Sequence, residues 1–127
     1  LVIYFYPKDD TPGCTKEACA FRDGRDMLAA LGAEVIGVSK DTTRAHAKFT
    51  EHHGLNFTLL SDKSTETIQA FGSWKLKKFM GREYMGINRD TYLVNPKGEI
   101  IKKYEGVDPA THFAEVYADL QQLTGHS

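Results

Sequence analysis

The order of apolar and polar positions predicts strands and helices that alternate along the chain. Residues 1–6 form an apolar run rich in β-branched and aromatic side chains, which is typical of a buried strand. Two prolines and a glycine then interrupt regular structure, and good helix formers follow. A helix is expected over residues 14–31, with Gly32 just after its end, although Gly24 weakens this prediction locally.

The middle of the chain continues the alternation. Residues 33–38 and 57–60 are expected to be strands. Between them, Asp41 is expected to cap a helix that ends at Gly54, and Ser64 is expected to cap a further short helix. This order of elements indicates a sheet with helices packed on its faces.

The last third of the chain predicts a hairpin and a final helix. Residues 91–94 and 99–104 resemble strands, and Pro and Gly between them suit a type I turn. Residues 79–88 are expected to be a loop. Asp108, which proline follows, is expected to cap a helix with one apolar stripe. The whole pattern predicts one α/β domain of three layers spanning residues 1–127.

Composition and charge narrow the classes of function. The net charge is -1 and charged residues of both signs make up 26%, so no basic stripe suggests a nucleic-acid partner. No apolar stretch approaches the roughly 20 residues that a membrane span needs. The chain begins inside an expected strand and does not begin with Met. We therefore expect that an N-terminal portion is missing, and a targeting segment within that portion stays an open alternative.

Two cysteines, Cys14 and Cys19, follow the first strand, and two are too few for a disulfide scaffold. A reducing compartment such as the cytoplasm, with catalytic thiols, is therefore expected. Cys14 falls at the first turn of the expected helix, where unpaired backbone N–H groups and the helix dipole stabilise a thiolate. The alternative is a small buried hydrophobe. Because Cys14 stands outside any apolar run, the residues favour a nucleophile.

The spacing of the two cysteines restricts how they can react together. Five residues along a helix place the two Cα atoms roughly 8–9 Å apart, whereas a disulfide needs them within about 7 Å. Two alternatives stay open for Cys19. It is inert packing, or it forms a disulfide with Cys14 after the first turns of the helix unwind.

The segment YFYPKDDTPGCTKEAC, from Tyr4 to Cys19, resembles the active-site segment of the peroxiredoxins. It is most similar to the peroxiredoxin Q, or bacterioferritin comigratory protein, group. Pro7, Thr11 and Cys14 match the family pattern of Pro, three residues, Thr or Ser, two residues and Cys. Three later segments resemble family segments in the expected order: residues 37–39, 60–62 and 86–92.

This resemblance implies a thioredoxin-like fold, with a central mixed sheet between helical layers, and a thiol-dependent peroxidase. It implies that Cys14 is the peroxidatic cysteine, which peroxide oxidises to a sulfenic acid, and that Cys19 is the resolving cysteine. The hydroxyl of Thr11 is expected to bind the peroxide and the thiolate, and Pro7 to shield the thiolate from water. Arg89 is expected to reach Cys14, stabilise its thiolate and orient the peroxide.

Alternatives to these site residues also follow from the sequence. Alone, Arg89 reads as a solvated arginine, and Arg22 and Arg82 are weaker competitors for its place. Cys-x4-Cys is not a usual zinc spacing, and Gly-rich phosphate loops are absent, so no metal, haem or flavin cofactor is expected. All five histidines are expected at the surface: His46, His52, His53, His112 and His126.

The expected partners follow from this chemistry. A hydroperoxide is the expected substrate, and a dithiol reductant of the thioredoxin type is the expected electron donor, with glutathione and a glutaredoxin as the alternative. The resemblance implies a monomer. Two rival functions are a peroxide sensor that passes oxidation to a partner protein and a general disulfide oxidoreductase. The second usually carries Cys-x-x-Cys, which this chain lacks.

Overall fold

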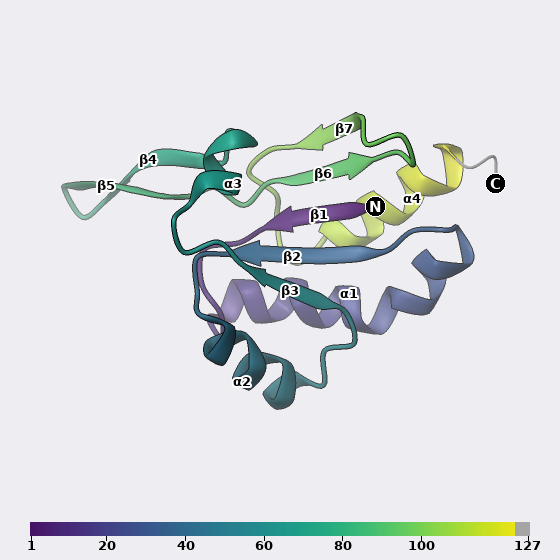
Figure 1. The fold of residues 1–127 in the computed structure, drawn as a ribbon, viewed down its shortest axis with the longest axis horizontal. Coiled ribbons are helices and arrows are strands. Elements are labelled where there is room, and N and C mark those ends of the chain that lie inside the picture. Colours follow the sequence, from purple (N-terminus) through teal and green to yellow (C-terminus); the bar gives the residue numbers. More distant parts are fainter. Residues whose placement is uncertain (124–127) are drawn as a thin grey trace.

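A five-stranded mixed sheet forms the centre of the molecule in a computed structural model that describes residues 1–123 (Figure 1). The sheet has the strand order β3-β2-β1-β6-β7. The strands are β1 (Val2–Phe5), β2 (Val35–Ser39), β3 (Thr58–Ser61), β6 (Thr91–Val94) and β7 (Ile100–Tyr104). The described helices are α1 (Pro12–Ala30), α2 (Thr43–His53), α3 (Glu66–Ala70) and α4 (His112–Leu123). A separate hairpin consists of β4 (Trp74–Phe79) and β5 (Arg82–Ile87).

The strand β1 is the centre of the sheet and has a neighbour of each direction. It pairs with β2 in parallel and with β6 antiparallel. The same division extends to the edges of the sheet: β2 and β3 are parallel, and β6 and β7 are antiparallel. Parallel strands need a crossover, which α1 and α2 supply, and the antiparallel pair needs only a tight turn. The predicted α/β domain with a mixed sheet is confirmed.

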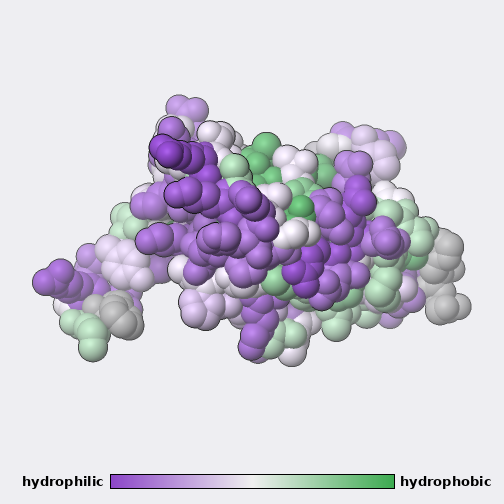
Figure 2. Space-filling model, turned by 90° about the horizontal axis from the view of Figure 1, so that it is seen from below, coloured by the Kyte–Doolittle hydropathy of each residue, from purple (hydrophilic) through white to green (hydrophobic). Residues whose placement is uncertain are grey.

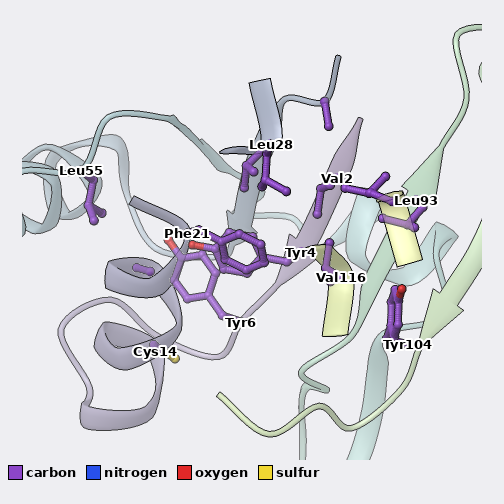
Figure 3. Close-up of a cluster of buried hydrophobic side chains, with 14 of the residues drawn as sticks. Val2, Tyr4, Tyr6, Cys14, Phe21, Leu28, Leu55, Leu93, Tyr104 and Val116 are labelled. Carbon is purple, nitrogen blue, oxygen red and sulfur yellow. The ribbon is translucent and has the colours of Figure 1, made fainter. Parts of the chain in front are cut away.

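Two apolar clusters cover the two faces of the sheet, because successive side chains of a strand point to opposite faces. On one face, Tyr4 packs with Phe21 of α1, Phe49 of α2 and Val116 of α4. Figure 3 shows this cluster, with Cys14 at its margin near Tyr6. On the other face, the second cluster consists of residues from the sheet, α3 and β5: Phe5, Val38, Ile68, Ile87 and Tyr92. The three layers follow from these two interfaces.

The helix α1 begins two residues earlier than expected. Pro12 is its first residue, where a proline costs no hydrogen bond because that N–H has no helical partner. Its last turn closes as predicted: Gly32 has φ 79°, and its N–H donates to the carbonyl of Ala29. Gly24 lies where α4 crosses α1, and a Cβ there would lie 1.9 Å from the ring of Phe113. This glycine therefore permits close packing of the two helices.

Several predicted boundaries need correction. Residues 79–88 are not a loop, because most of them belong to the hairpin of β4 and β5. Thr42 caps α2 in place of Asp41: Thr42 Oγ1 accepts from the N–H of Ala45, while the Asp41 carboxylate accepts from other residues. Thr65, not Ser64, precedes α3. The helix α4 starts at His112, four residues after Asp108.

The hairpin projects from one end of the molecule (Figure 1). Four of its large apolar side chains are exposed: Leu76, Met80, Tyr84 and Met85. The face that Figure 2 shows, which lies below the sheet in Figure 1, is mainly hydrophilic. Within residues 1–123, the structure contains no helix with the length and apolar character of a membrane span.

Candidate active site

Cys14 lies in the first turn of α1, directly after the loop that follows β1. It is the third residue of the helix, and its side chain is 1% exposed. The first turn is closed by the N–H of Thr15, which donates to the carbonyl of Thr11 at 2.8 Å. The N–H groups of the residues before Thr15 have no partner within the helix. The positive end of the helix dipole lies at this turn, and it favours the anionic form of a thiol placed there.

Arg89 provides the second source of positive charge at the sulfur. Its Nη2 donates to Cys14 Sγ at 3.2 Å, and its Nη1 donates to Glu17 Oε1 at 2.9 Å. Burial lowers the pKa of the Arg89 guanidinium, but Glu17 and Cys14 outweigh this effect and the net pKa is raised. Arg89 is thus a cation throughout the usual pH range and a charge-assisted donor to the thiolate.

The backbone around Arg89 holds the guanidinium in place. Arg89 lies between β5 and β6, and its carbonyl accepts from the N–H of Val107 at 2.9 Å. The neighbouring Asp90 is buried and accepts from Ser73 Oγ at 2.7 Å and from the N–H of Gly106 at 3.0 Å. Gly13 leaves room for the guanidinium, because a Cβ there would lie 3.2 Å from Arg89 Nη2.

Glu17 is a site residue that the sequence prediction missed. It is 1% exposed and forms an ion pair with Arg89. Burial raises the pKa of Glu17 to about 7, while Arg89 acts in the opposite direction. Within the described chain, its Oε2 has no hydrogen-bond partner. A signal was present, since Glu17 follows Cys14 by three residues and helical residues at that spacing share a face.

Thr11 and Pro7 lie in the loop before α1. Thr11 is the N-cap residue of α1, and its Oγ1 donates to the carbonyl of Lys8 at 2.9 Å. The hydroxyl proton of Thr11 is therefore engaged in this hydrogen bond, and the lone pairs of Oγ1 can still accept a hydrogen bond. The expected contact of Thr11 with the sulfur of Cys14, and the shielding by half-buried Pro7, stay predictions.

Cys19 lies on the same continuous helix as Cys14, and both are free thiols. Cys14 is buried and Cys19 is partly exposed. The helix geometry on which the disulfide argument rests is confirmed, whereas the resolving role stays a prediction. Of the competing arginines, Arg22 donates to the carbonyl of His53 at 2.5 Å, and Arg82 lies exposed on β5.

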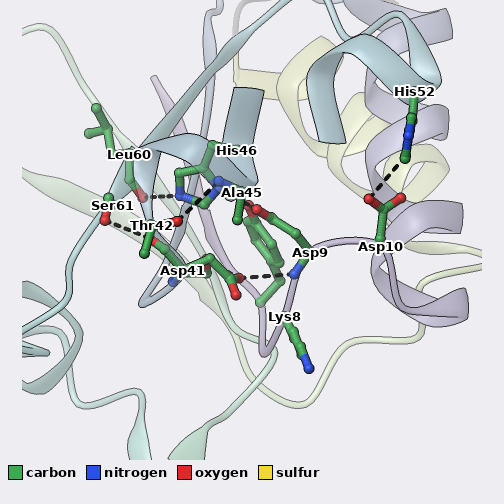
Figure 4. A network of polar contacts seen from close by, with 12 residues as sticks. Lys8, Asp9, Asp10, Asp41, Thr42, Ala45, His46, His52, Leu60 and Ser61 are labelled. Carbon is green, nitrogen blue, oxygen red and sulfur yellow. Dashed lines mark hydrogen bonds and ion pairs between the residues drawn. The ribbon is translucent and has the colours of Figure 1, made fainter. Parts of the chain in front are cut away.

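The prediction of surface histidines is wrong for two of them. His46 is buried, and its Nδ1 lies 2.6 Å from Asp9 Oδ2 (Figure 4). His112 is fully buried against Thr91, and burial lowers the pKa of its imidazole to about 4. Both rings pack into the domain because a hydrogen-bond partner satisfies a ring nitrogen there.

Two further histidines, His52 and His53, are accessible to solvent, as predicted. His52 is exposed and His53 is partly exposed, and both contact Asp10. His126 lies outside the described residues. Over residues 1–123, no group of three or more His, Cys, Asp or Glu side chains is arranged to hold a metal ion.

Known proteins are similar to this chain in sequence and in fold. The AhpC/TSA family model matches residues 1–103. Peroxiredoxin Bcp of Bacillus subtilis is 48% identical over 124 residues, which cover 98% of this chain and 79% of that protein. Peroxiredoxin Bcp of Escherichia coli K12 is 41% identical over 112 residues, which cover 88% of this chain and 72% of that protein.

Solved structures of peroxiredoxins also superpose well on this chain. The bacterioferritin comigratory protein of Xanthomonas campestris, studied for alkyl peroxide reduction, superposes with a TM-score of 0.92 at 36% identity. The match covers 97% of this chain and 78% of that one. Peroxidoxin BcpB of Mycobacterium tuberculosis superposes with a TM-score of 0.84 at 32% identity, covering 96% and 78%. The three-layer domain is thus a thioredoxin-like fold.

Proposed function

The chain belongs to the AhpC/TSA family and is a thiol peroxidase, and we propose that Cys14 is the residue that hydrogen peroxide and organic hydroperoxides oxidise. The observation that carries this assignment is the contact of Arg89 Nη2 with Cys14 Sγ at 3.2 Å, in the first turn of α1. A buried thiolate that contacts a guanidinium and lies at the start of a helix is both stabilised and oriented.

The first step is a displacement at oxygen. The Cys14 thiolate attacks one peroxide oxygen, an S–O bond forms, and the O–O bond breaks. The other oxygen leaves with the electron pair and takes a proton, which gives water or an alcohol, and Cys14 becomes a sulfenic acid. Arg89 and the N–H groups at the start of α1 stabilise the charge on the leaving oxygen. The lone pairs of Thr11 accept the O–H of the peroxide.

The second step uses Cys19. Its thiolate attacks the sulfenic sulfur of Cys14, the hydroxyl leaves as water after taking a proton, and a disulfide forms. The two cysteines lie on one continuous helix, where their Cα atoms are too far apart to bond. The first turns of α1 therefore unwind during each cycle.

The third step returns both thiols. A dithiol of the thioredoxin type supplies two electrons, because an intramolecular disulfide is a suitable target for its exchange reaction. Glutathione with a glutaredoxin is the alternative donor. A monomeric state and a reducing, cytoplasmic location accompany this proposal as predictions, as does the absence of a nucleic-acid or membrane partner.

Two serine variants test the assignment. Cys14→Ser is expected to abolish peroxide consumption, and Cys19→Ser to consume one equivalent and then stop. Retention of the wild-type second-order rate in Cys14→Ser would reject Cys14 as the reacting thiol. Repeated turnover with an excess of a thioredoxin-type dithiol separates the enzyme from the peroxide sensor, which the peroxiredoxin relatives do not favour.

A further inference from the structure

Two successive aspartates fasten the loop before Cys14 to α2 (Figure 4). Asp9 Oδ2 lies 2.6 Å from His46 Nδ1, and each side chain is 5% exposed. Asp10 Oδ1 lies 2.8 Å from His53 Nε2. Asp10 has φ 59°, a left-handed conformation that a non-glycine residue keeps only where its surroundings fix it. The loop is therefore held in place by α2, and the proposed reactions of Cys14 and Cys19 do not use these contacts.

His46 has a hydrogen-bond acceptor on each side of its ring. Its Nε2 lies 3.1 Å from the carbonyl oxygen of Leu60, which only accepts, so Nε2 carries a proton. Its Nδ1 faces Asp9 Oδ2, while Asp9 Oδ1 accepts from the hydroxyl of Tyr6 at 2.5 Å. A proton therefore also lies between Nδ1 and Asp9. The geometry is that of a buried imidazolium and carboxylate pair.

A short chain of bonds connects Asp9 to Thr11. The N–H of Asp9 donates to Asp41 Oδ2 at 2.9 Å, and Ser39 Oγ donates to the same oxygen at 2.7 Å. Both the backbone and the side chain of Asp9 are thus fixed. The preceding residue, Lys8, carries the carbonyl to which the Thr11 hydroxyl donates at 2.9 Å. The place of Asp9 therefore sets the direction in which the lone pairs of Thr11 point.

We propose that Asp9 and His46 are a positioning pair for the peroxide step. The pair holds the loop so that the Thr11 hydroxyl accepts a hydrogen bond from the peroxide as the Cys14 thiolate attacks. Neither residue touches the reacting atoms. The inference rests on the proposed function, because it concerns the same step at the same cysteine.

The pair depends on the extra proton. The titratable groups that face His46 in the described contacts are Tyr6 from β1, Asp9 from the loop and Asp41 from the segment before α2, while β3 presents the carbonyl of Leu60. Burial is the largest single effect and lowers the pKa of His46. The hydrogen bond and charge of Asp9, the carbonyl of Leu60 and the charge of Asp41 together outweigh it, so the net pKa is raised. The pair is intact below the ordinary pKa of histidine and weakens as the pH rises through the folded-state pKa.

Two substitutions of His46 separate its two contacts. In His46→Asn, the side-chain amide takes the place of Nδ1 and still donates to Asp9. In His46→Gln, the amide takes the place of Nε2 and donates to Leu60 only. Glu51→Gln, an exposed change on α2, is the control. Stopped-flow rates with hydrogen peroxide are compared with rates of Cys14 alkylation by iodoacetamide, under conditions where circular dichroism shows each variant folded.

His46→Gln is expected to react with peroxide about 10- to 100-fold more slowly than the wild type, since a small displacement of a positioning group has such effects. Its alkylation rate is expected to stay near the wild-type value, and His46→Asn to keep most of the peroxide rate. An equal loss of both rates in His46→Gln, or equal peroxide rates in the Asn and Gln variants, would overturn the proposal. If the wild type itself does not react with peroxide, the proposed function fails instead.

Discussion

Arg89 is the residue on which the reactivity of Cys14 depends most. Arg89→Ala removes one of the donors to the sulfur, and the peroxide rate is expected to fall about 10²- to 10³-fold. Arg89→Ala also leaves Glu17 buried without its cation, which costs stability. The double variant Arg89→Ala/Glu17→Gln removes that buried charge and isolates the effect on rate. A peroxide rate in the double variant close to that of the wild type would contradict the role of Arg89.

Glu17 competes with the thiolate for the same guanidinium. Glu17→Gln removes the negative charge while its carbonyl still accepts from Arg89 Nη1. The Cys14 thiolate, followed by its ultraviolet absorbance, is therefore expected to form at lower pH in this variant. Glu66→Gln on α3, far along the chain and exposed, is the control. A titration midpoint that moves upwards or stays unchanged would show that Glu17 does not act on the sulfur.

At the scale of single residues, the sequence predicts which residues form the site better than it predicts which polar side chains have a buried hydrogen-bond or ion-pair partner. Cys14 and Arg89 were predicted together, and the structure brings them into contact. Glu17 and His46 were missed or misjudged, because a single sequence does not show which polar side chains have a buried partner. Their burial depends on residues such as Arg89 and Asp9, which lie far away in the chain.

At the scale of elements, Gly24 sets the distance between α1 and α4. In Gly24→Ala, the added Cβ would overlap the ring of Phe113, and overpacking of this kind costs about 1–3 kcal/mol. Because the overlap at 1.9 Å is severe, we expect this cost to exceed the gain of about 1 kcal/mol in helix propensity, so the free energy of unfolding is expected to fall. In a Phe113→Ala background the same change is expected to be stabilising. Chemical denaturation measures both, and a destabilising effect in both backgrounds would reject the steric explanation.

The alternating strands and helices were predictable because apolar runs mark strands such as β1 and β2, and turn residues such as Gly32 and Gly54 mark the ends of helices. The hairpin of β4 and β5 was missed since β5 is exposed from Arg82 to Met85, so no alternation of buried and exposed positions marks that strand. The caps of α2 and α3 were misplaced by one residue. In α2 the reason is a tertiary contact, because the Asp41 carboxylate is engaged with Asp9 and Ser39.

At the scale of the whole molecule, two buried groups give opposite dependences of stability on pH. Glu17 has a folded-state pKa of about 7, above its ordinary 4.5, so the folded state holds its proton longer and stability falls between these pH values as pH rises. His112 has a folded-state pKa of about 4, below its ordinary 6.5, so stability rises with pH over that window. Each effect amounts to about 3 kcal/mol, and they largely cancel in the wild type.

Single variants are expected to reveal the two opposing slopes. In Glu17→Gln the free energy of unfolding is expected to rise by about 3 kcal/mol between pH 4 and 6.5, since of these two groups only His112 still titrates. In His112→Gln it is expected to fall between pH 4.5 and 7. Urea unfolding across this range measures both slopes. Two variants with the same slope as the wild type would show that neither group titrates in its buried place.

The most direct test of the account follows α1 and the two sulfurs through one oxidation. One equivalent of peroxide is added to the reduced protein, and peptide mass spectrometry with amide hydrogen exchange is applied before and after. We expect an intramolecular Cys14–Cys19 disulfide and faster amide exchange between Thr11 and Arg22, and we expect a dithiol to reverse both changes. A disulfide between molecules only, or oxidised protein whose α1 exchanges as slowly as before, would contradict it.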